Sequence, residues 1–393
     1  MANTLNLGNG NWATKEDSLL AYNSENGNFK PLAFNFTRAS SATVVNKAGL
    51  IETVGSGEPR IDFSNDAKGA LLLEPTRSNL IPYSNNLTNW NGAVMTTTLV
   101  DDLINPSNGL DASKLTQTSS GGYAWLSRTF TGNETFSAFV KKDSSNFVRL
   151  YAGGNSVYFN ILNGTIETIS GSVEDKSIID YGNGWFRISI SVNSTAASYV
   201  RIYPASSGSS SSGTNSLFVY GAQLEQGSYA TSYIPTQGSA VTRVAESCSQ
   251  TVPSGIIGQT EGTVFLDVDF KTLSGTNMFV SIRPDASNKI EIYRTDAAIY
   301  GEFASDASFN FNKPSVTVGR YKIAVAYSSG SSAMYINGVL IGSNTTPFAF
   351  TSTLDGIYIN SRGTTFIEQS SYNDVKLYNT RLSNAELQAL TSN

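Results

Sequence analysis

The sequence contains no histidine and a single cysteine, Cys248. Without histidine, a Ser-His-Asp or Cys-His pair cannot activate a nucleophile, and no metal site can use an imidazole ligand. One cysteine excludes an intrachain disulfide. Because no partner base accompanies Cys248, we expect an inert thiol in a linker-like segment. A Gly-rich phosphate loop followed by Lys-Ser or Lys-Thr is also missing.

Charge and long apolar runs are scarce as well. Charged side chains make up 15% of the 393 residues and the formal net charge is −5, which provides no basic field for nucleic acid or anionic lipid. No window approaches the roughly 20 apolar residues of a membrane-spanning helix. The first ten residues lack the basic and apolar regions of a signal peptide. We therefore expect no nucleic-acid or membrane partner and synthesis in a cytosol.

The abundant residues favour β-structure. Aromatic residues reach 11% and hydrophobic residues 40%, and Ser, Thr, Asn and Gly are frequent, as in β-rich proteins with polar turns. Apolar and polar residues alternate with period two in many segments, which are bounded by turn residues. The clearest are 135–141, 147–151, 157–161, 185–192 and 216–224, and further strands are expected at 262–270, 289–293, 321–327 and 333–341. With no helical pattern between them, they predict an all-β fold with two tandem antiparallel β-sandwiches; the resemblance given below implies the jelly-roll type.

Five segments are expected along the chain: an extended N-terminal anchor (1–33), a connecting and docking module (34–90), a first sandwich (91–238), a linker (239–260) and a second sandwich (261–393). The anchor has too few apolar residues to fold alone. The stretch from Phe36 to Asn79 carries strand-like apolar runs at 43–45 and 71–73. These runs must bury against the following sandwich or against copies of the chain in an oligomer.

Three local signals predict individual elements. Asn337-Gly338 between apolar runs predicts a two-residue hairpin. Ser383 with Glu386 forms a capping box that opens one short C-terminal helix, which Leu387 and Leu390 would pin. Thr14 with Asp17 three residues on is compatible with one or two helical turns.

Sugar binding requires aromatic faces and a few polar partners. Five aromatic side chains near polar turns are candidates, although each also suits core or interface packing: Tyr123, Trp125, Tyr151, Tyr293 and Tyr300. We assign glycan binding to Tyr123, Trp125, Tyr293 and Tyr300.

Longer motifs carry a family likeness. Residues 262–393 resemble the concanavalin A-like lectin and glucanase jelly roll in its laminin-G-like form, through Arg320-Tyr-Lys-Ile-Ala, Tyr335-Ile-Asn-Gly-Val and Val375-Lys-Leu-Tyr-Asn-Thr-Arg-Leu-Ser-Asn-Ala-Glu-Leu. The middle region, which ends in Tyr220-Gly-Ala-Gln-Leu-Glu-Gln, resembles the carbohydrate-binding-module-like sandwiches of phage fibres.

The opening Asn9-Gly-Asn-Trp-Ala-Thr, together with Phe36-Thr-Arg-Ala-Ser-Ser-Ala-Thr and Leu71-Leu-Leu-Glu-Pro-Thr-Arg, resembles head (capsid) fibre proteins of crAss-like phages. This resemblance covers nearly the whole chain. It implies a virion structural protein assembled in the bacterial host cytoplasm. The protein would be a homotrimer, fixed to the capsid by its N-terminus and presenting lectin-like heads to host-surface or gut glycans. The expected anchoring residues are Trp12, Leu19, Leu20 and Tyr22. A tail fibre or receptor-binding protein and a free glycan-binding adhesin are the alternatives.

An enzyme is the least favoured class. Glycosidases on this kind of jelly roll need two carboxylates across the scissile bond. Asp267 and Asp269 share one strand face, and Glu291 is a third candidate, but the glucanase pattern Glu-x-Asp-x-x-Glu is missing. We therefore expect a solvated strand face and no catalytic residue. No dense Asp cluster marks a metal site, and no cofactor is expected.

Overall fold

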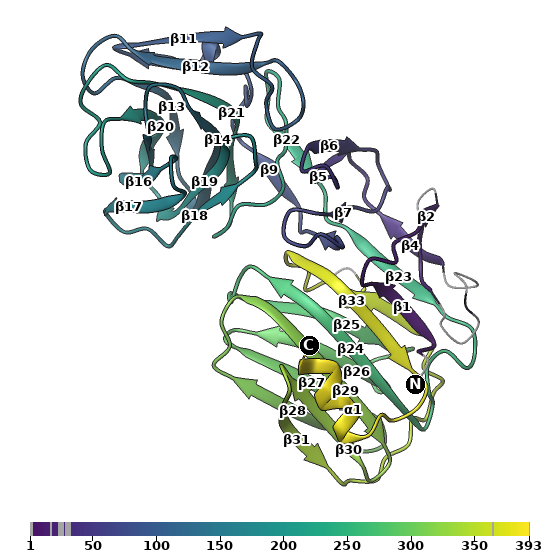
Figure 1. The fold of residues 1–393 in the computed structure, drawn as a ribbon. Coiled ribbons are helices and arrows are strands. Elements are labelled where there is room, and N and C mark those ends of the chain that lie inside the picture. Colours follow the sequence, from purple (N-terminus) through teal and green to yellow (C-terminus); the bar gives the residue numbers. More distant parts are fainter. Residues whose placement is uncertain (1–2, 16–17, 23–26, 28–32, 364, 393) are drawn as a thin grey trace. The chain divides into compact units, whose positions relative to one another are not determined.

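The computed structural model describes residues 3–15, 18–22, 27, 33–363 and 365–392. Its strands form antiparallel ladders and confirm the predicted all-β fold. The chain divides into two compact units, each considered by itself (Figure 1). Unit 1 comprises Met1–Ser41, Val54–Pro75 and Val244–Asn393, and unit 2 comprises Ala42–Thr53 and Thr76–Arg243.

Unit 1 contains two sheets. Sheet I runs in the order β31-β30-β29-β24-β33-β8-β7, with β1 also paired to β33. Its strands are β1 (Leu5–Gly8), β7 (Ile61–Asp62), β8 (Ala70–Leu73), β24 (Glu261–Phe270), β29 (Gly319–Ser328), β30 (Ser332–Ile336), β31 (Val339–Asn344) and β33 (Ser370–Tyr378). Sheet II runs β2-β3-β4-β23-β32-β25-β26-β27-β28. Its strands are β2 (Thr14–Lys15), β3 (Ser18–Leu20), β4 (Ala33–Thr37), β23 (Ser247–Thr251), β25 (Thr276–Ile282), β26 (Lys289–Thr295), β27 (Ala298–Ala304), β28 (Phe309–Pro314) and β32 (Gly356–Ile359).

Unit 2 also contains two principal sheets. Sheet III runs β10-β13-β20-β15-β16-β17, and sheet IV runs β11-β12-β21-β14-β19-β18. Sheet III consists of β10 (Asn91–Ala93), β13 (Tyr123–Thr129), β15 (Phe147–Ala152), β16 (Asn155–Asn160), β17 (Thr165–Ser170) and β20 (Ala197–Ala205). Sheet IV consists of β11 (Met95–Val100), β12 (Ala112–Gln117), β14 (Gly132–Lys142), β18 (Asp175–Asp180), β19 (Trp185–Ser194) and β21 (Ser216–Gln226). Shorter elements are the pairs β5 (Ala42–Val45) with β6 (Ile51–Val54) and β9 (Arg77–Asn79) with β22 (Val241–Arg243), and a 3-10 helix at Leu87–Asn89.

Strand alternation separates the core of each unit from its outer faces. Along β24, Val264, Leu266 and Val268 belong to the large apolar core of unit 1. Phe265 packs in a second cluster with Leu387 of the C-terminal helix, and Asp267 lines a groove described below. Because successive side chains point to opposite faces of a sheet, this strand supplies both core residues and residues of the outer face.

The stretch from Phe36 to Asn79 buries its apolar runs in the chain's own sandwiches. Leu71 and Leu73 are fully buried in the core of unit 1. Val45 and Ile51 pack in unit 2 in a cluster that includes Phe139. The sequence left open whether these runs pack against the chain's own sandwich or against other copies of the chain. In the structure they pack within the chain.

The segments expected as an anchor and a linker also contain strands. Where residues 1–33 are described, they add strands to both sheets of unit 1, and Leu5 pairs with Leu377 across the edge of β33. Residues 239–260 contain β22 and β23. The helical turns expected from Thr14 were wrong for the described residues, because β2 and β3 pair there and β3 continues onto β4; Asp17 lies outside the described residues.

Two local predictions are confirmed. Asn337 and Gly338 connect β30 to β31 with φ of 47° and 77°, the left-handed pair that a two-residue hairpin turn requires. Helix α1 (Asn384–Ser392) begins after Ser383, whose backbone N–H donates to Glu386 Oε2 at 2.7 Å, while the Glu386 N–H donates to Ser383 Oγ at 3.3 Å. Leu387 is fully buried. Among the described residues, no helix is long and apolar enough to cross a membrane.

A buried ionic cluster joins distant segments of unit 1. Glu246 Oε1 lies 2.7 Å from Arg38 Nη1 and accepts from Arg60 Nε at 2.7 Å, and Arg60 Nη2 lies 2.8 Å from Glu74 Oε2. All four side chains are fully buried. Burial alone would lower the pKa of Arg60, but the adjacent carboxylates of Glu246 and Glu74 outweigh it and hold that pKa above its ordinary value.

We predict that Glu246→Gln lowers the free energy of unfolding of unit 1 by about 3–5 kcal/mol, because removing one partner leaves buried charge uncompensated. Chemical denaturation measures the loss, and hydrogen exchange of β4, β8 and β23 locates it. The exposed Glu52→Gln in unit 2 is the matched control. Equal stability of the two variants would contradict the prediction.

Candidate functional site

The outer face of sheet III carries aromatic and arginine side chains. We define the aromatic–arginine surface by Tyr123, Trp125, Arg149, Tyr151, Tyr158, Tyr199, Arg201 and Tyr203. These residues occupy alternate positions of β13, β15, β16 and β20, and the intervening residues belong to the core of unit 2. Tyr158 and Tyr203 are buried, and the other six side chains are half-buried. The surface is therefore a consequence of strand alternation.

The pairing register of the strands places each arginine of this surface directly opposite aromatic residues of the neighbouring strands. Arg201 lies opposite Trp125 on one side and opposite Tyr151 on the other. In the adjacent row, Arg149 lies between Tyr203 and Tyr158. Directly opposed side chains on one face of an antiparallel pair are within contact distance, so each guanidinium is surrounded by aromatic rings.

The contacts within this surface are close. Arg201 Cζ lies 4.5, 4.7 and 4.8 Å from the ring centroids of Tyr199, Tyr123 and Tyr151. Arg149 Cζ lies 4.9 Å from the Tyr203 centroid. Such distances allow cation–π attraction, which holds the rings and guanidinium groups in place before any ligand arrives.

One hydrogen bond links a cation to a phenol on this surface. Arg201 Nη1 donates to the Tyr203 hydroxyl at 3.1 Å. Burial raises the pKa of Tyr203, and the nearby Arg201 only partly offsets that rise. Tyr203 therefore remains a neutral phenol at physiological pH.

The other predicted pair, Tyr293 and Tyr300, lies in unit 1. The two residues pair across β26 and β27, with ring centroids 5.2 Å apart and an interplanar angle of 13°. Charged neighbours surround them but neutralise one another: Lys289 Nζ lies 2.6 Å from Glu302 Oε1 and 3.1 Å from Glu291 Oε2. The four predicted glycan-binding residues thus form two separate pairs, Tyr123 with Trp125 and Tyr293 with Tyr300.

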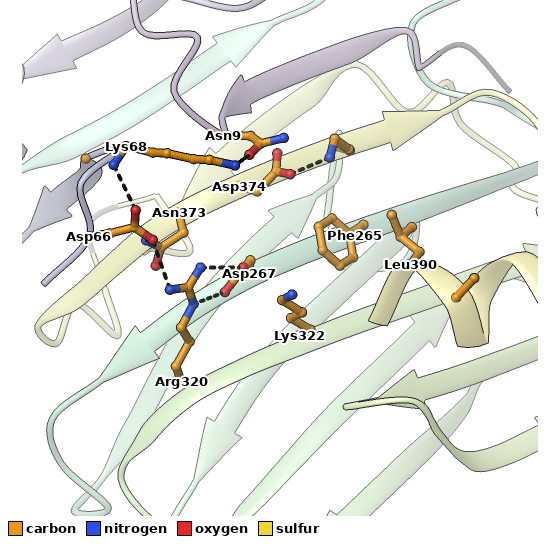
Figure 2. Close-up of a pocket in the computed structure, with 13 residues that line it drawn as sticks. Asn9, Asp66, Lys68, Phe265, Asp267, Arg320, Lys322, Asn373, Asp374 and Leu390 are labelled. Carbon is orange, nitrogen blue, oxygen red and sulfur yellow. Dashed lines mark hydrogen bonds and ion pairs between the residues drawn. The ribbon is translucent and has the colours of Figure 1, made fainter. Parts of the chain in front are cut away.

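A polar groove crosses the outer face of sheet I, beside the end of helix α1. Figure 2 shows the groove, whose volume is about 450 Å³. Its main lining residues are Asn9, Asp66, Lys68, Phe265, Asp267, Arg320, Lys322, Asn373, Asp374, Lys376 and Leu390. Arg320 bridges two carboxylates: its Nε donates to Asp267 Oδ1 at 2.6 Å and its Nη1 to Asp66 Oδ2 at 3.0 Å. The charges of the groove are largely paired within it.

The carboxylates weighed as catalytic candidates do not form one site. Asp267 is ion-paired with Arg320, and Asp269 with Lys271 at 2.6 Å, both on the outer side of β24. The solvated strand face expected here is instead an ion-paired one. Glu291 lies on β26 of the other sheet, fully buried among Arg283, Lys289 and Arg362. Among the described residues, no group of three or more potential acidic or cysteine ligands is positioned for a metal ion.

The remaining predicted residues lie in unit 1. Leu19 is fully buried in the core, whereas Trp12, Leu20 and Tyr22 are half-buried. Trp12 Nε1 donates to the Lys68 carbonyl at 2.9 Å. Cys248 is fully buried in β23, in a strand and not in a linker, and burial raises the pKa of its thiol. A buried, protonated thiol agrees with the expected inert role.

Sequence reasoning missed Arg149, Arg201 and three tyrosines of the aromatic–arginine surface: Tyr158, Tyr199 and Tyr203. A signal for most of them was present. Tyr199-Val-Arg-Ile-Tyr and Phe147-Val-Arg-Leu-Tyr alternate apolar residues with aromatic and arginine residues. In a sandwich strand, large aromatic and cationic residues at every solvent-facing position indicate a binding face.

No protein-family model and no curated protein matches the chain. Solved structures similar to part of it include the CBM40 of the Ruminococcus gnavus IT-sialidase bound to alpha2,3 sialyllactose, at 18% identity over 35% of this chain and 84% of that one, with a TM-score of 0.31. The leech intramolecular trans-sialidase complexed with 2,7-anhydro-Neu5Ac is similar at 17% identity over 34% of this chain and 24% of that one (TM-score 0.30). The binding domain of botulinum neurotoxin serotype D shares 12% identity over 37% and 40% of the two chains (TM-score 0.32). These TM-scores are too low to transfer a ligand or an activity to this chain.

Asp374 in the groove of sheet I should make the stability of unit 1 depend on pH. Burial raises the pKa of Asp374 above 3.8, Lys376 opposes this rise and the charge of Asp267 adds to it. The folded protein therefore holds this proton more tightly than the unfolded chain does. As pH rises through 3.8 and then through the folded pKa, the wild type loses stability relative to Asp374→Asn.

Thermal unfolding from pH 3.5 to neutral pH measures this difference. We expect the Tm of Asp374→Asn, relative to the wild type, to rise across that window. The exposed Asp101→Asn should show no comparable trend. A relative Tm of Asp374→Asn that falls with rising pH would contradict the raised pKa.

Proposed function

We propose that the protein binds carbohydrate, and that unit 2 receives sugar rings on its aromatic–arginine surface. One observation carries this proposal: four neighbouring strands of sheet III present half-buried aromatic rings interleaved with hydrogen-bond donors. The C–H-rich faces of pyranose rings stack on aromatic side chains, while their hydroxyls require directional polar partners. Both chemistries occur side by side on sheet III.

The opposite side of unit 2 supports the assignment by contrast. On sheet IV, Phe139, Trp185 and Tyr220 also stand on the outer face, but they pack in a cluster with Val45, Ile51 and Tyr233. Trp185 donates its indole N–H to the Ile104 carbonyl at 3.0 Å. Those aromatics serve packing within the unit, whereas the rings of sheet III retain exposed surface.

The arrangement of the rings suits a ligand longer than one sugar. Tyr123 contacts Tyr203 with centroids 4.6 Å apart, and Trp125 contacts Tyr199 edge to face at 5.1 Å. These contacts fix the rings and reduce the entropy lost on binding. Because the rings extend over several neighbouring strands, an oligosaccharide lying across the strands would meet more than one of them.

We predict that Trp125→Ala weakens oligosaccharide binding about tenfold, because a stacking contact and its buried area are lost. Isothermal titration against the oligosaccharides selected from a glycan array measures the change. Tyr300→Ala, which removes a stacked ring from the other unit, is the matched control. Loss of binding in Tyr300→Ala but not in Trp125→Ala would contradict the proposal and place the sugar site in unit 1.

We also propose that the chain is a virion fibre that displays this surface, with tail fibre and free adhesin as alternatives. The resemblance of residues 9–14, 36–43 and 71–77 to phage head fibres supports the proposal. The half-buried Trp12, Leu20 and Tyr22 retain exposed surface with which a capsid protein could pack. In this proposal the chain associates with two further copies of itself in a homotrimer and with a capsid protein.

Two measurements test the fibre proposal. We predict a mass near three times 42.0 kDa for the full chain in analytical ultracentrifugation, and gold label against the chain on the capsid of intact particles in electron microscopy. Label at the tail would favour a tail fibre. A chain that stays monomeric at high concentration and labels no particle would contradict the virion role.

A further inference from the structure

The two arginines of the aromatic–arginine surface are close to one another. Arg201 is directly opposite Tyr151 and Arg149 directly opposite Tyr203 on the same strand pair, so the arginines are diagonal neighbours. Both guanidinium groups contact the Tyr151 ring, with Cζ at 5.9 Å for Arg149 and 4.8 Å for Arg201. Two positive charges are thereby concentrated in the middle of an aromatic platform.

Neither charge is neutralised by the protein. In the part of the chain that the structure describes, no carboxylate lies within ion-pair distance of Arg149 or Arg201. Arg149 donates no hydrogen bond to a described residue, and Arg201 donates one, to Tyr203. The Nε atoms of both are buried without a protein acceptor. A guanidinium offers five N–H donors in a planar fork, so the described residues use little of the donor capacity of these two arginines.

The other aromatic cluster shows that the chain can neutralise such cations. Next to Tyr293 and Tyr300, Lys289 is paired with Glu302. Glu291 of the same sheet accepts a hydrogen bond from Arg362 Nε at 2.8 Å. Neither arginine of unit 2 has such a carboxylate among the described residues, so an anion that reached them would find unpaired guanidinium groups.

From these observations we infer that the ligand of the aromatic–arginine surface is an acidic sugar, a pyranose bearing a carboxylate or a sulfate. This inference rests on the proposed carbohydrate function. The tyrosine and tryptophan rings stack on the sugar faces, and the forks of Arg149 and Arg201 bind the anionic group. Arginine suits this role because its planar donors match carboxylate and sulfate oxygens in a bidentate way.

The net charge of the chain does not favour an anionic ligand, so the two arginines themselves must provide the affinity. The formal net charge is −5, so the protein as a whole repels anions and long-range attraction cannot account for acidic-sugar binding. The affinity must come from contact with the two guanidinium groups in their partly desolvated positions. Binding should accordingly be specific to these two residues and weaken with added salt.

The test uses the full-length protein and matched ligand pairs. Oligogalacturonate is compared with its methyl ester, and a sulfated galactan fragment with its desulfated form. Arg149→Gln and Arg201→Gln are measured beside Lys142→Gln, an exposed cation on sheet IV of the same unit. Arg201→Lys separates charge from bidentate geometry, and circular dichroism confirms that each variant is folded.

We expect at least one acidic ligand to bind about tenfold or more tightly than its neutral partner. Each Gln variant should remove most of that difference, Arg201→Lys should restore only part of it, and Lys142→Gln should leave it unchanged. The carboxylate and sulfate arms identify which anion is preferred. Equal binding of acidic and neutral partners, or equal losses in all three Gln variants, overturns the inference and leaves carbohydrate binding intact. Absence of binding to every sugar on the array overturns the proposed function itself.

Discussion

The contact of one carboxylate with two arginines, in the interior of unit 1, connects parts of the chain that are far apart in sequence. Glu246 lies just after Val244, where the chain re-enters unit 1. Its carboxylate contacts Arg38 and Arg60, and its Oε2 accepts from the backbone N–H of Glu74 at 2.9 Å. Arg38 also donates to the carbonyls of Ser40 and Glu58 at 2.9 and 3.1 Å. Since buried charges are tolerated only when they are paired and hydrogen-bonded, folding of unit 1 must bring these segments together.

The stretch between Phe36 and Asn79 contributes residues to both units. Its leucines fill the core of unit 1, and Val45 and Ile51 cover an outer face of unit 2. In the same stretch, Arg38, Arg60 and Glu74 belong to the buried ionic cluster of unit 1. Apolar burial is roughly proportional to area and not directional, so it does not by itself select which segments of unit 1 lie together. The ion pairs and hydrogen bonds of the cluster, in contrast, form only between particular atoms in a particular geometry.

Prediction from sequence succeeded where the governing interactions are local. Strand alternation, the Asn337-Gly338 turn and the Ser383–Glu386 capping box each depend on residues a few positions apart, and each is present. The partners of the opening segment were beyond reach, because Leu5 pairs with Leu377 and no periodicity encodes so distant a pairing. Tyr123 and Trp125 were found as aromatic residues near turns, but Arg149 and Arg201 were missed because their meaning depends on the register of three strands.

The same register argument accounts for the difference between the two faces of unit 2. A sandwich becomes stable by filling the space between its sheets, and this leaves the outward positions of each strand free to vary. On sheet IV those positions are used for packing against Val45 and Ile51. On sheet III they carry rings and guanidinium groups whose mutual contacts replace a covering layer. Because cation–π contacts with the rings hold each arginine without consuming its in-plane N–H donors, the surface can be ordered in the free protein and still have hydrogen bonds to offer. An arginine held by a carboxylate, as Arg320 is by Asp267, would be ordered too, but it would have little capacity left for an anionic ligand.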